Sequence, residues 1–248
     1  MASSDANTKT SGGIDILSVP KKELHPKAIL KNYWPLIIFG LFIVLFVSAI
    51  VALKLYKDAQ PADISKLVLK PDANDPYLGK FIAPLVVVEA ADIRCPGCKN
   101  FYDNIEPDLK RNYIDTGKIK FYFWDVLIDN ASLQASEATY CANDQGKYWE
   151  YRSEFLVLPR DEGNWGKILN RSEFIAIAQD LNLDTAVFGA CLDSEKYKDK
   201  VLEKSEQALA TGMTFSPTLF LSSGKVLPGV GFYNTLANEI DRFFNLNK

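Results

Sequence analysis

Apolar and polar positions divide the chain into an N-terminal part with one long apolar run and a C-terminal part with short periodic runs. Residues 1–32 are polar and begin with MASSDANTKTSGG, a composition typical of a disordered tail. The run from Asn32 to Leu53 contains no charged residue and, at ~1.5 Å per residue, is long enough for a helix to cross a hydrocarbon core of ~30 Å. Aromatic residues suited to membrane interfaces stand at its two ends, namely Tyr33, Trp34 and Tyr56. The pattern predicts one uncleaved transmembrane helix at 33–56.

Two alternatives to an anchor remain open for this run. A buried core helix is one, although such helices are usually shorter and amphipathic. A cleaved signal peptide is the other, although its apolar region would be shorter and no small-x-small cleavage site follows the run. Lysines flank both ends in equal number, so their distribution does not indicate which end lies in the cytoplasm.

The C-terminal part begins with a predicted linker at 57–80 and continues with the pattern of a parallel strand–helix–strand unit. PLVVVEA is a short apolar run with three valines, as in a buried strand, and KIKFYFWDV supplies the next strand at Ile119–Val126. The predicted helix between them starts near Cys95, is kinked by Pro107 and ends at Gly117. Its apolar stripe consists of Phe101, Ile105, Leu109 and Tyr113.

Residues 131–211 have a helix-favouring composition, interrupted by one loop at PRDEGNWG. After them, SPTLFL and KVLPGV predict two strands of a hairpin joined by SSG. A final helix carries an apolar face formed by Leu236, Ile240, Phe243 and Phe244. The predicted order is strand, helix, strand, a helical block, two strands and a helix, with 131–211 lying between 81–130 and 212–248.

Composition and charge narrow the functional classes. With 48% apolar and 24% charged residues the chain is typical of a globular protein, and its net charge of −3 does not indicate a nucleic-acid partner. The single histidine is His25, which excludes a Ser-His-Asp or Cys-His mechanism and a histidine-ligated metal for the rest of the chain. Any chemistry of the four cysteines therefore proceeds without a histidine.

Cys95 and Cys98, in DIRCPGCKNFYDN, are the candidate working thiols. They lie three apart at the start of the predicted helix and share one helical face, so their sulfurs can meet. Unpaired backbone N–H groups and the positive end of the helix dipole favour a thiolate at Cys95, and such cysteines have pKa values of roughly 3.5 to 7. A thiolate that attacks disulfides and leaves easily is what thiol–disulfide exchange requires. Pro96 fits the first helical turn because its missing N–H would have no partner there.

Two other uses of this pair remain as alternatives. A four-cysteine zinc site would need a second close pair, but Cys141 and Cys191 lie far apart, each alone. A purely structural disulfide between cysteines three apart would constrain the unfolded chain very little. We predict no metal site.

Several segments resemble the DsbA-like thioredoxin-fold oxidoreductases, especially the membrane-anchored BdbD type. The first is DPYLGKFIAPLVVVEAADIRCPGCKNFYDNIEPDLKRNYIDTGKIKFYFWDV, and CANDQGKYWEYRSEFL, FGACLDSEKY and GMTFSPTLFLSSGKVLPGV follow in the family's order. The match covers about 72–244. The resemblance implies an α/β protein in which 81–130 and 212–248 form a thioredoxin core, 131–211 is an inserted helical domain, and a single transmembrane helix precedes them.

The resemblance also assigns roles to residues. It implies that Cys95 is the exposed nucleophile and Cys98 its buried partner. Pro217 corresponds to the family's cis-proline, which lies opposite the cysteine pair and would leave the backbone of Ser216 free to pair with an extended substrate. Pro96 and Gly97 would lie along the same substrate-binding surface. The alternative for Pro217 is an ordinary trans proline at the start of a strand.

Glu89 ends the first predicted strand, six residues before Cys95. The resemblance implies a buried acid that exchanges protons with the buried thiol, and an unpaired buried carboxyl has a raised pKa. The alternative is a partly solvated glutamate at the end of the strand.

Three positions depart from the family pattern. Gly97 stands where DsbA has a histidine, alanines in EAADIRC stand where relatives often have an aromatic residue, and Ser216 replaces the commoner threonine or valine. These differences bear on oxidising strength rather than on the fold. The charge of Arg94 would partly compensate by favouring the Cys95 thiolate, although an exposed arginine would add little.

For Cys141 and Cys191 we hypothesise a structural disulfide within the inserted domain, because both fall in its helices and the compartment is oxidising. In the entropy model it would stabilise the fold by at most about 4 kcal/mol. Two buried free thiols are the alternative.

The resemblance implies a membrane-anchored thiol–disulfide oxidoreductase that introduces disulfides into unfolded or reduced exported proteins. A DsbB-like or VKOR-like membrane protein would reoxidise the pair, and the exchange itself needs no metal or organic cofactor. A disulfide-donating site belongs outside the cytosol, which places the N-terminus in the cytoplasm and the catalytic domain beyond the cell membrane. A reductase or isomerase on the same scaffold is one alternative, and a redox-inactive peptide-binding chaperone is another.

Overall fold

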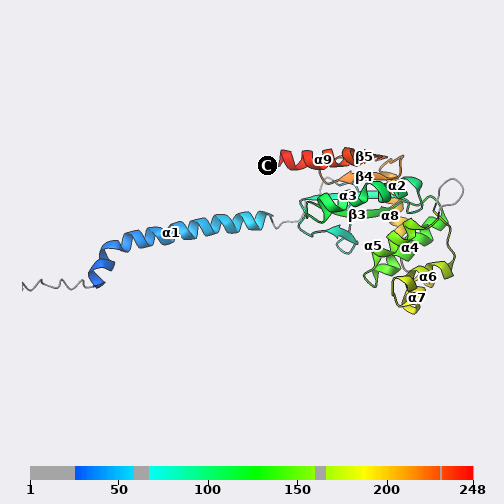
Figure 1. Ribbon diagram of the computed structural model, residues 1–248, viewed down its shortest axis with the longest axis horizontal. Helices are drawn as coiled ribbons and strands as arrows, with labels where there is room; N and C mark the ends of the chain where they lie inside the picture. Colours follow the sequence, from blue (N-terminus) through cyan, green and yellow to red (C-terminus); the bar gives the residue numbers. More distant parts are fainter. Residues whose placement is uncertain (1–25, 59–66, 160–165, 230, 248) are drawn as a thin grey trace, which may run out of the picture. The chain divides into compact units, whose positions relative to one another are not determined.

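The computed structural model describes residues 26–58, 67–159, 166–229 and 231–247 (Figure 1). The chain forms two compact units that divide between Tyr56 and Lys57. Most of the predicted polar tail, the middle of the predicted linker and most of PRDEGNWG lie outside the described residues.

The first unit contains one long helix, α1 (Pro26–Asp58). Among the described residues it is the one helix that is long and apolar enough to cross a membrane, with a mean hydropathy of 3.1 in its Tyr33–Tyr56 segment. The helix already includes 26–32, which we expected to belong to the polar tail.

The second unit is built on a five-stranded mixed sheet, as far as the described residues go, with the strand order β1-β3-β2-β4-β5 (Figure 1). The strands β1 to β5 are Tyr77–Gly79, Leu85–Ala91, Ile119–Asp125, Thr218–Leu221 and Val226–Pro228. The central strands β2 and β3 are parallel, whereas β1, β4 and β5 each run antiparallel to their neighbour. The register places Val87 of β2 opposite Phe121 of β3 and Leu221 of β4.

The segment after β2 is divided into three helical pieces, where we predicted one kinked helix. These are α2 (Pro96–Asn104), α3 (Glu106–Leu109) and a π-helical turn, η1 (Lys110–Ile114). The break lies at Ile105, whose φ of −122° is outside the helical range. Pro107 follows the break in the first turn of α3, where a missing N–H has no cost. The interruption near Pro107 is thus confirmed, and it is a full break.

Five helices occupy most of the predicted insertion: α4 (Asn130–Asn143), α5 (Tyr148–Val157), α6 (Arg171–Asp180), α7 (Thr185–Asp193) and α8 (Lys198–Ala210). The first four pack around a core that includes Tyr151, Phe174 and Phe188. The last one, α8, spans two cores: its Val201 belongs to the same core, whereas its Ala208 packs with sheet residues such as Val88. The end of the predicted insertion therefore covers one face of the sheet.

The C-terminal elements agree with the predicted pattern. β4 and β5 form a hairpin whose turn contains Gly224 at φ +87°, a conformation that favours glycine. The closing helix α9 (Tyr233–Leu246) buries Leu236 and Ile240 against the sheet. The predicted linker is too long, however, because β1 and the buried Leu69 belong to the folded domain.

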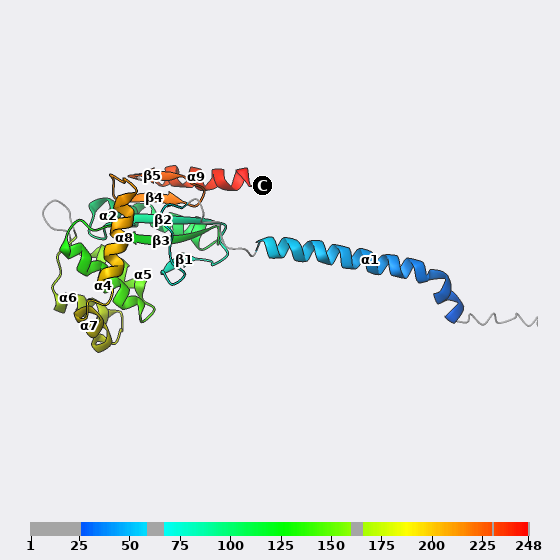
Figure 2. The same ribbon diagram turned by 180° about the vertical axis from the view of Figure 1, so that it is seen from behind.

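Helices cover both faces of the sheet, which explains why β2 and β3 are buried along their whole length. Figure 1 shows α2 and α3 in front of the strands, and Figure 2, from behind, shows α8 crossing the opposite face. Side chains alternate along β2, so Val87 packs towards α2, α3 and α9 while Val88 packs towards α8. The same alternation directs Glu89 towards the layer of α2 and α3.

Candidate functional site

Cys95 and Cys98 lie where the chain leaves β2 and enters α2. Cys95 is the N-cap residue and Pro96 the first residue of the helix. Both cysteines are unbonded thiols, with 7% of Cys95 and 0% of Cys98 exposed. The expectation of an exposed Cys95 is therefore wrong, although it is the more accessible of the two. Ser216 contributes to this burial, because its carbonyl oxygen lies 3.5 Å from Cys95 Sγ.

The surroundings of the two thiols move their pKa values in opposite directions. A hydrogen bond from the Cys98 thiol is the main cause that lowers the pKa of Cys95 to about 6, and the side chain of Ser216 and the backbone N–H of Gly97 add to it. Burial raises the pKa of Cys98 well above its usual value, and the nearby Glu89 carboxylate adds to that effect. At neutral pH the site therefore holds a thiolate at Cys95 beside a thiol at Cys98.

The peptide bond between Ser216 and Pro217 is cis, and the loop before β4 lies against both thiols. Ser216 Oγ is 3.4 Å from Cys98 Sγ and accepts a hydrogen bond from the backbone N–H of Asp92 at 3.2 Å. Phe215, one residue earlier, is 59% exposed. The loop thus contacts both sulfurs through Ser216 and presents the apolar ring of the preceding residue to solvent.

Gly97 makes a very close approach to this loop. A Cβ atom at position 97 would lie 2.6 Å from the carbonyl oxygen of Ser216 and 3.1 Å from Cδ of Pro217. The carbonyl oxygen of Ser216 is part of the backbone and cannot move aside as the end of a flexible side chain can. Glycine is therefore the residue that fits at position 97. The departure from histidine at this position has a steric reason in this chain.

Glu89 is fully buried and pairs with Arg152 of α5. Arg152 Nη2 donates to Glu89 Oε2 at 2.8 Å, and its Nη1 donates to Oε2 of Glu106, in α3, at 2.9 Å. The guanidinium also stacks on Phe123, 4.6 Å from the ring centroid. Burial raises the pKa of Glu89 to about 8, against the opposing effect of Arg152, and the charges of Glu106 and Cys95 raise it as well. The alternative of a partly solvated glutamate is wrong.

A second buried network fixes the loop between β2 and α2. The Asp92 carboxylate accepts hydrogen bonds from the backbone N–H groups of Arg94 at 2.7 Å and Ile128 at 2.9 Å. Arg94 is only 4% exposed, and its side chain pairs with Asp129 and donates to the carbonyl of Gly166. Arg94 therefore joins the active-site loop to the helical insertion.

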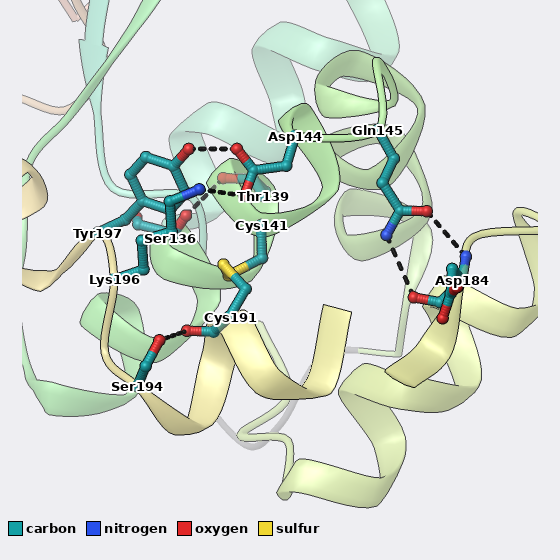
Figure 3. The surroundings of a disulfide bond; sticks show 10 residues. All are labelled: Ser136, Thr139, Cys141, Asp144, Gln145, Asp184, Cys191, Ser194, Lys196 and Tyr197. Carbon is teal, nitrogen blue, oxygen red and sulfur yellow. Dashed lines mark hydrogen bonds and ion pairs between the residues drawn. A yellow bond between two sulfur atoms is a disulfide. The ribbon is translucent and has the colours of Figure 1, made fainter. Parts of the chain in front are cut away.

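The other two cysteines form a disulfide that links α4 to α7 (Figure 3). The Cα atoms of Cys141 and Cys191 are 5.8 Å apart. Close by, Figure 3 shows the Asp144 carboxylate accepting hydrogen bonds from Lys196 and Tyr197. Within the described ranges, no group of His, Cys, Asp and Glu side chains is arranged to hold a metal ion.

Arg152 and Glu106 are the site residues that sequence reasoning missed. The signal was present in YWEYRSEF, where Tyr148, Tyr151 and Phe155 form the buried face of a helix and Arg152 falls within it. A charged residue on such a face needs a buried counter-charge, because an unpaired charge in the core is very costly.

Comparison with known proteins agrees with this geometry. The family model described as thioredoxin matches residues 72–231. The chain is 26% identical over 174 residues to disulfide bond formation protein D of Bacillus subtilis, which covers 68% of this chain and 77% of that protein. It is 27% identical over 172 residues to a probable disulfide bond formation protein D of Bacillus anthracis, covering 66% and 76%.

Solved structures show the same fold. The crystal structure of α-DsbA1 from Wolbachia pipientis superposes with a TM-score of 0.63 at 25% identity, covering 72% of this chain and 94% of that one. Oxidised BdbD from Bacillus subtilis gives a TM-score of 0.61 at 24% identity, covering 68% and 92%. The predicted α/β fold, a thioredoxin core with inserted helices, is confirmed. The thioredoxin family model matches more than half of this chain, and the chain therefore belongs to the thioredoxin family.

Proposed function

We propose that this protein is a membrane-anchored thiol–disulfide oxidoreductase that donates a Cys95–Cys98 disulfide to exported proteins. The observation that carries the proposal is the contrast between the two thiols, with a lowered pKa at Cys95 and a raised pKa at Cys98, beside the cis bond at Pro217. The names of its relatives, disulfide bond formation proteins, support the direction of the transfer.

The reaction moves two electrons from the substrate to the enzyme. A substrate thiolate attacks Cys95 Sγ, and the electron pair of the enzyme disulfide goes to Cys98 Sγ, which takes up a proton. A second substrate thiolate then attacks the substrate sulfur of the mixed disulfide, and Cys95 leaves as a thiolate. A thiol with a low pKa is a good leaving group, so the lowered pKa of Cys95 favours release of the oxidised substrate.

The surface beside the thiols suits an unfolded substrate. The exposed ring of Phe215 offers an apolar contact, and the backbone of Ser216 lies beside Cys95, where an extended chain could pair with it. Pro96 and Gly97 would border the same surface. We therefore propose reduced, unfolded exported proteins as the substrate class.

The apolar helix α1 would anchor the enzyme, with the N-terminus in the cytoplasm and the catalytic domain outside the cell membrane. One helix cannot carry the two electrons away, so a membrane partner of the DsbB-like or VKOR-like type would reoxidise the pair. Labelling intact cells with an impermeant maleimide tests this topology. Protection of reduced Cys95 from the reagent would contradict it.

The direction of transfer is tested by the reduction potential of the Cys95–Cys98 pair. The full-length protein in detergent is equilibrated in glutathione buffers, and its thiols are counted by alkylation and mass spectrometry. A double variant, Cys141→Ala with Cys191→Ala, removes the second disulfide from the count. A potential near about −120 mV supports disulfide donation, whereas a value near about −270 mV would indicate a reductase and overturn the proposal.

A further inference from the structure

The helical insertion contains a cavity of about 380 Å³ that the proposed reaction does not use. It lies between α4, α6, α7 and the start of α8, and Leu133, Phe174 and Leu192 form the apolar part of its wall. Cavities that bind small ligands have volumes of roughly 300–1,000 Å³ and combine an apolar wall with a few polar groups. This cavity is therefore large enough for one long side chain.

The buried polar group in the wall is the carboxyl group of Glu137, in α4. Glu137 is only 5% exposed, and its Oε1 has no hydrogen-bond partner in the described part of the chain. The two ion pairs at the cavity are Arg171 with Asp193 and Lys198 with Glu195. Glu137 belongs to neither pair, and the side chains of both pairs are between 41% and 61% exposed, so solvent screens their charges. Glu137 is thus a buried acid without a direct counter-charge among the described residues.

The electrostatic surroundings of Glu137 favour a cation in the cavity. Burial raises the pKa of its carboxyl group, and the charge of Glu195 adds to this effect against the smaller opposing effect of Lys198. A buried carboxylate is costly unless a positive, hydrogen-bonding group lies beside it. Ammonium and guanidinium groups supply both the charge and several N–H donors. The complementary ligand therefore carries a positively charged nitrogen group.

The other lining residues describe the rest of the ligand. The apolar part of the wall can cover a methylene stem, as apolar surfaces do for the stems of long basic side chains. Asn130 and Gln134 also line the cavity, and their amide oxygens can accept further N–H donors. Within the described ranges, no group of carboxylates is arranged to hold a metal ion, so an organic cation is the better match. A lysine or arginine side chain has all of these features.

The cavity begins next to the active-site loop. Asn130 directly follows Asp129, and the Asp129 carboxylate lies 2.6 Å from Arg94, the residue before Cys95. An extended chain advances by about 3.3 Å per residue. A polypeptide held at Cys95 can therefore bring a basic side chain to the cavity within a few residues.

We propose that this cavity binds a lysine or arginine side chain of a substrate polypeptide whose cysteine reacts at Cys95, and that Glu137 pairs with its charge. The inference rests on the proposed function and adds one feature to the substrate class, a basic residue a few positions from the reacting cysteine. Glu137 is then a specificity-determining residue that contacts the substrate away from the reacting sulfur atoms. The helical insertion supplies this substrate subsite.

The test compares two reduced, unfolded peptides that differ at one position, with the full-length protein in detergent. One peptide has a lysine about two to six positions from its cysteine, in a series that varies the spacing, and the other has a glutamine there. At the best spacing the lysine peptide should have a KM about tenfold lower, the effect expected of one hydrogen-bonded charge pair. Peptides with serine in place of cysteine should show the same ratio of Kd values, measured by fluorescence anisotropy.

Three enzyme variants connect this preference to the cavity. Glu137→Gln keeps the shape of the side chain and removes its charge, so the preference for the lysine peptide should be lost. Gln134→Lys places a competing ammonium group at an exposed position of the wall and should have the same effect, which covers the case in which Glu137→Gln does not fold. Glu206→Gln is the matched control, because it removes an exposed carboxylate of α8 outside the cavity lining and should keep the wild-type preference.

Several outcomes would overturn the inference. One is equal KM values for the lysine and glutamine peptides in the wild-type enzyme at every spacing, and another is a preference that persists in a folded Glu137→Gln protein. Binding of free n-butylammonium without any preference for the lysine peptide would assign the cavity to small amines and would also overturn it. Failure of the wild-type enzyme to oxidise either peptide would instead contradict the proposed function, and the Kd values of the serine peptides would still decide whether the cavity binds lysine.

Discussion

The two cysteine pairs of this chain have different surroundings, and these surroundings separate the proposed reactive pair from the structural one. Cys95 and Cys98 are unbonded, lie at the start of a helix, and both approach Ser216. Cys141 and Cys191 are bonded, although 50 residues separate them, and join two helices of the insertion. Sequence distance therefore says little about which pair is a permanent crosslink.

Charge is the clearest difference between the two pairs. The reactive pair lies near the buried ion pair of Glu89 and Arg152. Beside the disulfide, the ion pair between Lys196 and Asp144 is partly exposed, and solvent-screened pairs have little effect on their surroundings. A reactive pair needs groups that stabilise each sulfur when the two are apart, whereas a structural pair needs the correct separation of its backbones.

The largest expected effect comes from Cys95→Ser. Because Cys95 is the proposed point of attack, peptide oxidation should fall by about 10³-fold or more. Cys98→Ser should retain a reactive Cys95 that forms a mixed disulfide with substrate but releases it slowly. The rate of oxidation of a reduced peptide is the measurement, with the Cys141→Ala, Cys191→Ala double variant as the control that should stay active. Substantial activity in Cys95→Ser would favour a redox-inactive chaperone.

The pH dependence of Cys95 tests the electrostatic part of the comparison. With a pKa of about 6, Cys95 in the reduced enzyme should be half ionised near pH 6 and should react with iodoacetamide there roughly 10²-fold faster than a cysteine in the unfolded chain. Thiolate absorbance near 240 nm and the alkylation rate should give the same midpoint. A midpoint near pH 8.5 would show that the Cys98 thiol, Ser216 and the backbone at the helix start do not stabilise the thiolate.

The same shift predicts how stability depends on pH. The pKa of Cys95 is lower in the folded state than the value of 9.0 for a free thiol, so between about pH 6 and 9 the unfolded chain holds a proton that the folded chain does not. This contribution to the stability of the reduced enzyme therefore grows with pH across that window and is lost as pH falls through about 6. The oxidised enzyme, which has no free Cys95, should lack it.

Removal of the insertion disulfide should lower stability without removing activity. In the entropy model a loop of this length contributes at most about 4 kcal/mol, so Cys141→Ala with Cys191→Ala should shift the urea midpoint downwards. Cys95 and Cys98 belong to the same buried core as the disulfide, so the disulfide affects them only through the stability of that core. The rate of thiol–disulfide exchange should therefore fall only under conditions in which the variant begins to unfold. An unchanged midpoint, or a folded variant that cannot exchange, would contradict the structural role.

Local patterns in the sequence predicted the elements of the fold that bury a regular face. The valines of β2, the β4–β5 hairpin and the apolar face of α9 all lie where the pattern placed them. β1 was missed because Tyr77–Gly79 is too short to show alternation. The break at Ile105 was expected only as a kink, because a proline fits either a bend or the first turn of a new helix.

The candidate site could be predicted only where its residues are close in sequence or where a family resemblance supplied them. The thiol pair belongs to the first kind and Pro217 to the second. The partners of Glu89 could not be predicted, because Arg152 is 63 residues away and comes from the insertion. Burial of Arg94 depends in the same way on a contact with Gly166 across 72 residues. Periodicity describes the face that a residue occupies and says nothing about the partner that it meets there.

The smallest expected effect, and the most specific to the reactive pair, concerns Gly97. A Cβ atom at this position would meet the carbonyl oxygen of Ser216 at 2.6 Å, so Gly97→Ala should push the cis-proline loop away and destabilise the protein by about 1–3 kcal/mol. The side-chain hydrogen bond of Ser216 to Cys95 would weaken, and the pKa of Cys95 should rise. Gly231→Ala is the matched control. Among the described residues, the atom nearest to its Cβ would be the carbonyl oxygen of Gly229, 4.0 Å away, so the change should be neutral or slightly stabilising. Thiolate titration and urea unfolding of both variants measure the two effects. If Gly97→Ala and Gly231→Ala had the same Cys95 pKa and the same urea midpoint, the close approach of the Ser216–Pro217 loop would not be what lowers the pKa of Cys95.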